Sequence, residues 1–228
     1  MTLARSIAEG EYYHIFNRGA HKHNLFRDER DWARFLYLLL YCQAPVAIPN
    51  TKRFITPSAV ASGFRVPLHY ESEIAKKRKV ELIAFCIMPN HFHLIVKELK
   101  EGGISAYMQR VATGYTMYYN AKYKATGHMF QGRYKTVHIN DNDQLLYLSA
   151  YIHRNPRELE KWRGLEQAYP YSSLQDLAAV NRWGSLLSGD IITTQFEGTK
   201  ESNYRDFVNT SSAKLFEEQL PEKSLLFA

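Results

Sequence analysis

The chain has 228 residues, of which 45% are hydrophobic and 23% charged, a composition that excludes disordered, collagen-like and fibrous proteins. Its longest apolar run, residues 35–42, is far shorter than the roughly 20 residues of a membrane-spanning helix, and no secretory signal is readable at the start. Two cysteines without CxxC spacing argue against a disulfide framework or a cysteine-based zinc site, so we expect a cytoplasmic location. The net charge of +6 permits nucleic-acid binding, and residues 101–140 carry five basic residues against one acidic residue.

Hydrophobic periodicity and turn residues predict alternating strands and helices over the first two thirds of the chain. In chain order we predict a strand at 11–17, a helix at about 29–43, an irregular excursion at 44–79, a hairpin at 80–97, a helix at 104–124, a strand at 129–139 and a helix at about 143–154. This β-α-β-β-α-β order indicates an α+β protein with a ferredoxin-like split fold, in which helices pack on a central antiparallel sheet.

The predicted organisation is a domain over 1–174 and a helical extension or tail over 175–228. The excursion at 44–79 contains four prolines and ends in a four-residue basic run. We expect it to be a peripheral insertion with room for one short element.

Two histidines in the second strand of the hairpin are the sharpest chemical feature of the sequence. His91 and His93 are two residues apart, and positions i and i+2 of a strand point to the same face. Such a pair can begin a divalent metal site if a third ligand joins it; the alternative is a pair of hydrogen-bonded structural histidines. His21 and His23 have the same spacing but follow a turn in a polar segment, so we expect them to be exposed.

Tyr115 lies on the apolar stripe of the helix at 104–124, the side that must pack toward the sheet. A tyrosine at such a position is ordinarily a core residue with a satisfied hydroxyl. The functional alternative is a nucleophile directed at a metal held by the histidine pair. A phenol has a pKa near 10, so it needs help to lose its proton at neutral pH.

Several segments together resemble one family. MPNHFHLIV at 88–96 is similar to the His-hydrophobic-His (HUH) motif of bacterial single-strand DNA transposases. YYHIFNRG, YTMYYNAKY, TGHMFQGRYK, YIHRNP and YPYSS follow the order of the same family. The chain therefore resembles the REP-associated tyrosine transposases, relatives of the smallest insertion-sequence transposases, over residues 11–43 and 80–175.

The resemblance implies a metal-dependent endonuclease and strand transferase that acts on single-stranded DNA. His91 and His93 would hold Mg²⁺ or Mn²⁺, and Tyr115, matched through YTMYYN, would attack the scissile phosphate to form a 5′-phosphotyrosine link. Relatives have a polar side chain one turn after the tyrosine, where this chain has Tyr119, so the expected third ligand is Asn120. The alternatives are a catalytically silent hairpin-binding protein and, more distantly, a relaxase or replication initiator.

The implied partner is a REP hairpin, a DNA stem-loop with single-stranded flanks, bound by a chain that is expected to act as a monomer and away from membranes. The basic residues expected to contact its backbone are Arg18, Arg110, Lys122, Arg133 and Lys135. The aromatic residues expected to stack on unpaired bases are Tyr13, Phe130 and Tyr134.

Overall fold

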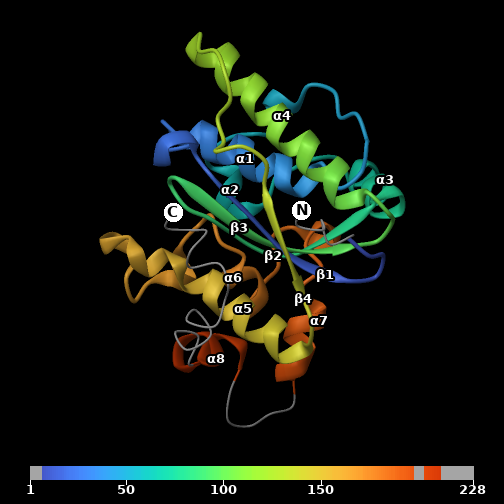
Figure 1. Cartoon of the computed structure of the whole chain (residues 1–228), viewed down its shortest axis with the longest axis vertical. Helices are drawn as coiled ribbons and strands as arrows, with labels where there is room; N and C mark the ends of the chain where they lie inside the picture. The colour runs from blue at the N-terminus through green and yellow to red at the C-terminus, as the bar shows by residue number, and fades with distance from the viewer. Residues whose placement is uncertain (1–6, 198–202, 212–228) are drawn as a thin grey trace, which may run out of the picture.

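The computed structural model describes residues 7–197 and 203–211 and contains a four-stranded antiparallel sheet in the order β2-β3-β1-β4 (Figure 1). The strands are β1 (Tyr12–Arg18), β2 (Val80–Ile87), β3 (His91–Glu98) and β4 (Lys135–Ile139). The helices are α1 (Glu29–Tyr41), α2 (Ala59–Ser62), α3 (Leu68–Lys77), α4 (Gly103–Tyr123), α5 (Asn142–Arg154), α6 (Leu174–Ala178), α7 (Asp190–Thr193) and α8 (Tyr204–Thr210).

Helices cover both faces of the sheet, with α1 and α4 on one side and α5 on the other (Figure 1). The ring of Phe92 on β3 lies 5.3 Å from that of Phe35 on α1, whereas the next residue, His93, lies 5.6 Å from the ring of Tyr151 on α5. Successive side chains of a strand point to opposite faces, so the histidines of β3 face α5. The strand order and the two helices on one face confirm the predicted ferredoxin-like α+β fold.

Local signals set the ends of the first helix as the sequence predicts. The carboxylate of Asp28 accepts hydrogen bonds from the backbone of Arg30 and Asp31, and Asp31 completes a reciprocal capping box. The strand predicted at 129–139 is shorter, because residues 128–134 leave the ladder. In that segment Phe130 makes an isolated bridge to Gly19, and Gly132 adopts a φ of 83° that interrupts regular extension.

The excursion between α1 and β2 is more ordered than the sequence predicts. It contains two helices, α2 and α3, where we expected room for one short element. Val60, Phe64 and Ile74 are buried in the core, and the ring of Phe64 lies 5.4 Å from that of Trp183. The segment therefore packs on the core and on the C-terminal part of the chain.

The residues that follow α5 line the open edge of β2. The backbone N–H groups of Ser173 and Ser188 donate to carbonyls of β2, and an N–H of β2 donates to Tyr171. Leu177 and Leu186 join the same hydrophobic core as the sheet, so residues on both sides of the predicted 174/175 boundary share one core. Residues 212–228 of the predicted tail lie outside the described residues. Within the described part of the chain, no helix has the length and apolar character needed to cross a membrane.

Candidate active site

His91 and His93 lie side by side on β3, with ring centroids 5.1 Å apart. Each uses its Nδ1 atom to contact a neighbour: His93 lies 2.9 Å from Nε2 of His14 on β1, and His91 lies 2.7 Å from Oδ1 of Asn90. Burial lowers the pKa of His91 and holds that of His93 well below its usual value. Both imidazoles are therefore neutral at pH 7, which leaves their Nε2 atoms able to act as ligands.

Helix α5 brings a tyrosine and an asparagine to the same place. The side chain of Asn155, directly after α5, places Oδ1 3.2 Å from Nε2 of His91, while its Nδ2 donates to the Tyr151 carbonyl. The half-buried ring of Tyr151 packs edge-on against His93. Residues four apart share one face of a helix, so Tyr151 and Asn155 are presented together to the histidine pair.

The donor atoms at this point fit a divalent cation. The Nε2 atom of His93 is buried without a hydrogen-bond partner, an arrangement that carries a desolvation cost unless a ligand satisfies it. Both ring nitrogens of His91 face amide oxygens, Nδ1 at 2.7 Å and Nε2 at 3.2 Å, and a neutral ring has one proton for the two. With the proton on Nδ1, at the shorter contact, Nε2 keeps a lone pair beside Oδ1 of Asn155, and a cation between them would satisfy both atoms. Over residues 7–197 and 203–211 no three His, Cys, Asp or Glu side chains cluster as a metal site. A metal bound by His91 and His93 would therefore need the amide oxygen of Asn155 as its third protein ligand.

Tyr115 lies on the other side of the sheet from the histidine pair. It is on the sheet-facing stripe of α4, as expected, but its ring packs with Phe35 and its hydroxyl donates to the Leu25 carbonyl at 2.5 Å. The side chain is fully buried, and burial followed by the nearby Asp31 carboxylate raises its pKa. The structure thus places Tyr115 in the core, because α4 covers the face opposite the one that the histidines occupy.

The expected third ligand, Asn120, is also on α4 and is not near the histidines. Its Nδ2 donates to the Gly127 carbonyl and closes the loop after the helix. A signal in the sequence could have pointed to the pair on α5: the position four residues after Tyr115 is Tyr119, whereas the position four residues after Tyr151, within YIHRNP, is Asn155. His14 carries no comparable signal, because only strand pairing brings it beside His93.

The five basic residues expected to contact DNA separate into two groups. The guanidinium of Arg110 donates twice to the Cys42 carbonyl at the end of α1, and Lys122 pairs with Asp28 and Asp31 at its start. Both residues stabilise the fold through these contacts.

The remaining three basic residues, Arg18, Arg133 and Lys135, lie close to the end of the sheet that carries His91 and His93. Arg18 pairs with His91 across β1 and β3, and Lys135 pairs with Phe16, which faces His93. These two therefore lie on the histidine face, and Arg133 is exposed in the segment before β4.

The second histidine pair lies outside this site. His21 and His23 are exposed, as expected, with ring centroids 6.1 Å apart in the turn after β1. Both belong to the surface and not to the cluster on β3.

The fold and the cluster together define a class: a split antiparallel sheet with paired histidines on one strand, faced by a tyrosine on a helix. Residues 46–155 match the family model described as "Transposase IS200 like". A solved structure described as a REP-associated tyrosine transposase bound to a REP hairpin has the same fold, with a TM-score of 0.52 and 15% identity over 84% of this chain and 93% of that chain. No curated protein matches the chain. The family model thus matches just under half of the chain and the solved structure shares its fold, and both findings agree with the resemblance predicted from the sequence.

Proposed function

We propose that the chain cleaves and rejoins single-stranded DNA next to hairpins, with Tyr151 as the nucleophile and His91, His93 and Asn155 as the metal-binding set. The observation that carries the proposal is the contact between Nε2 of His91 and Oδ1 of Asn155, beside the His93 ring, whose Nε2 is unsatisfied and which packs against the Tyr151 ring. This set takes the place of the one expected around Tyr115, whose hydroxyl is buried on the opposite face.

In the proposed reaction Tyr151 attacks a phosphate of the DNA strand and becomes linked to it. The Tyr151 hydroxyl loses its proton to solvent, and its oxygen attacks the scissile phosphorus; the bond from phosphorus to the 3′ oxygen breaks, and that oxygen takes up a proton. The products are a 5′-phosphotyrosine and a free 3′-hydroxyl. A second 3′-hydroxyl reverses the step, so rejoining needs no external energy. A bound Mg²⁺ or Mn²⁺ would act as a Lewis acid on the phosphate, and two imidazoles with one amide oxygen suit Mn²⁺ better.

Basic residues on the histidine face support a DNA strand as the substrate. Arg18 sits opposite His91 in the ladder, and Lys135 lies on the neighbouring strand β4. Side chains of this kind position the phosphate backbone without reading its sequence. The solved structure with the same fold is described as bound to a REP hairpin, and a stem-loop of that kind is the proposed partner here.

One chain supplies every group of the proposed site, because β3 and α5 of the same chain form it. We therefore propose that the chain works as a monomer. Light scattering over a range of concentrations would show a single mass, and a stable dimer would contradict this.

The deciding experiment is a cleavage assay on a labelled REP-type hairpin with single-stranded flanks, in Mn²⁺ or Mg²⁺, resolved on a denaturing protein gel. The wild-type chain should give a covalent protein–DNA band that requires the metal. Tyr151→Phe should give no band, because the attacking oxygen is removed. Tyr115→Phe is the matched control and should retain the band, since its hydroxyl donates to the Leu25 carbonyl on the other side of the sheet.

Three results would change the assignment. An adduct that survives in Tyr151→Phe and disappears in Tyr115→Phe would return the nucleophile to α4. An adduct unaffected by Asn155→Ala and by chelation would exclude the proposed metal set. Tight hairpin binding without an adduct under any condition would instead support the silent hairpin-binding protein.

A further inference from the structure

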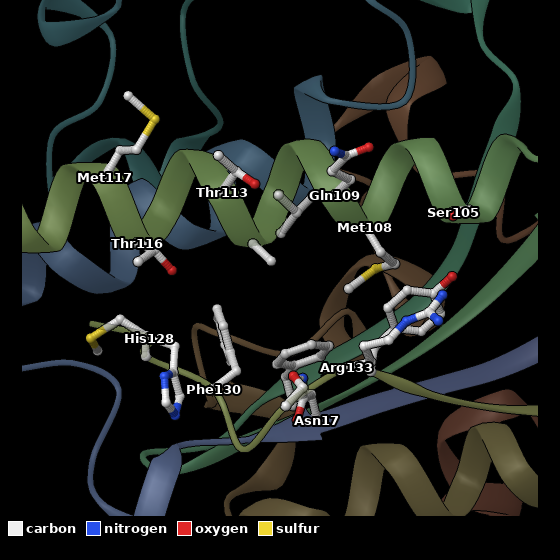
Figure 2. A pocket seen from close by; sticks show the side chains of 16 residues that line it. Asn17, Ser105, Met108, Gln109, Thr113, Thr116, Met117, His128, Phe130 and Arg133 are labelled. Atoms are coloured by element: carbon white, nitrogen blue, oxygen red, sulfur yellow. Dashed lines mark hydrogen bonds between the residues drawn. The ribbon is translucent and has the colours of Figure 1, made fainter. Parts of the chain in front are cut away.

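A cavity of about 670 Å³ lies on the sheet face opposite the histidines, between α4 and residues 128–134 (Figure 2). Its volume is within the range of sites that hold a small molecule or a single residue of a partner. Figure 2 shows α4 along one side and Phe130 projecting from the facing segment toward the helix. The cavity and the proposed active site therefore lie on opposite faces of one thin sheet.

The lining of the cavity suits a flat, uncharged ring attached to an anion. Aromatic side chains of Phe92, Phe130 and Tyr134 contribute to its walls, and the exposed Arg133 lies at the end near Met108 (Figure 2). No carboxylate is present among the described residues that line it. Aromatic walls bind base faces, and a guanidinium binds phosphate.

The strands connect this cavity directly to the proposed active site. Asn17 on β1 lines the cavity, while its neighbour Arg18 pairs with His91 on the other face. Phe92 lines the cavity between the two active-site histidines of β3. A nucleic-acid strand that passes around the end of β1 could therefore contact both places.

The surface at the end of β1 has the charge for that path. The turn at 18–27 and the segment at 124–135 lie side by side, since the backbone N–H of Ala20 donates to Met129 and that of Gln131 donates to Arg18. Residues 18–27 contain three Lys or Arg and residues 124–135 contain three, and neither range contains an Asp or Glu. Two adjoining segments with this excess of positive charge attract a phosphate backbone rather than an uncharged peptide.

We propose that this cavity binds one unpaired base of the DNA against its aromatic wall, in which Tyr134 is the half-buried ring, while Arg133 contacts the adjoining phosphate. This site rests on the proposed function, since it takes its ligand from the same strand. It would hold the DNA at a fixed distance from Tyr151, so the occupied base selects where cleavage occurs. The cavity is thus a specificity site separate from the chemistry.

The test uses a DNA hairpin with single-stranded flanks, in which each unpaired base is replaced in turn by an abasic residue. Binding is measured by fluorescence anisotropy without metal, so that no cleavage takes place. One position should weaken binding to the wild-type chain by about tenfold to a hundredfold, the usual contribution of one stacked base. Ala112→Phe, which fills the cavity from α4, should bind more weakly and lose the sensitivity at that position.

Ala121→Phe is the matched control, because Ala121 is exposed on α4 outside the lining; it should keep the wild-type profile. A second measurement needs no substitution in the protein: 2-aminopurine at the sensitive position should lose fluorescence when the wild-type chain binds, because it stacks. An Ala112→Phe chain with the wild-type profile, or no sensitive position and no quenching, would overturn the base site alone. Failure of the wild-type chain to bind the intact hairpin would overturn the proposed function as well.

Discussion

A buried chain of hydrogen bonds ties α5, which carries Tyr151, to β2 and to α8. The backbone N–H of Phe85 donates to the hydroxyl of Ser173, which lies 2.8 Å from Nε2 of His153. Nδ1 of His153 lies 2.6 Å from the hydroxyl of Tyr204, which donates to Ser149 at 3.0 Å. Burial lowers the pKa of His153 to about 3, so the ring is neutral, and it is bonded to Tyr204 through Nδ1 and to Ser173 through Nε2.

Replacing Tyr204 with Phe should break this chain at one point. The substitution removes one hydroxyl and leaves the buried Nδ1 atom of His153 without a hydrogen-bond partner. An unsatisfied buried donor or acceptor costs about 1–3 kcal/mol. In a chain of this length each kcal/mol lowers the melting temperature by about 2–4 °C, so we expect a decrease of about 2–12 °C. Because His153 lies between Tyr151 and Asn155, the rate of adduct formation should also decrease while hairpin affinity stays unchanged.

Thermal unfolding followed by circular dichroism measures the stability, and the gel assay measures the rate. Tyr70→Phe is the matched control: Tyr70 is half-buried on α3, and its hydroxyl makes no hydrogen bond to the described part of the chain. It should change stability by less than about 0.5 kcal/mol. If Tyr204→Phe unfolded at the temperature of the control and formed the adduct at the wild-type rate, the hydrogen-bond chain would not position α5.

Two further predictions separate structural contacts from DNA contacts. Arg110→Gln removes both charged hydrogen bonds to the carbonyl at the end of α1, so it should cost about 1.5–3 kcal/mol in thermal unfolding with hairpin affinity unchanged; Lys135→Gln should instead weaken hairpin binding and reduce its salt dependence by about one charge. Gly63→Ala should destabilise the chain more than Gly10→Ala: both glycines have nearly the same φ, +88° and +87°, but only at Gly63 would the new Cβ meet the Arg182 carbonyl oxygen, at 2.6 Å, with open space at Gly10. Equal melting temperatures for the two glycine variants would show that the backbone around Gly63 accommodates the added methyl group without loss of stability.

The elements that position the site are largely determined by local sequence. Two mostly apolar runs on either side of Pro89-Asn90 specify the hairpin, Asp28 begins α1 through its capping box, and Asn155-Pro156 ends α5. Their β-α-β-β-α-β order restricts the topology to the split sheet that the structure shows. The histidine pair is likewise readable from its spacing, because strand geometry alone places His91 and His93 on one face.

The proposal of Tyr151 in place of Tyr115 as the nucleophile depends on tertiary structure. Both faces of β3 are covered by helices, so Phe92 and Leu94 on one face are as buried as His93 and Ile95 on the other. The residue pattern of β3 therefore does not indicate whether the histidines face α4 or α5. The apolar stripe of α4 likewise does not indicate which face of the sheet that helix covers. Packing resolves this: α4 covers the phenylalanine face and buries Tyr115, whereas α5 covers the histidine face.

Long-range contacts also decided which basic residues remain at the surface. In the sequence, Arg110 and Lys122 resemble cations that bind phosphate. In the structure Arg110 donates to the Cys42 carbonyl at the end of α1, 68 positions away, and Lys122 donates to Asp28 at its start, 94 positions away. His14 reaches His93 across 79 positions only because β1 pairs with β3. Local propensity determines the helices and strands, while contacts between residues distant in sequence determine which side chains meet, and the candidate chemistry of this chain depends on the second.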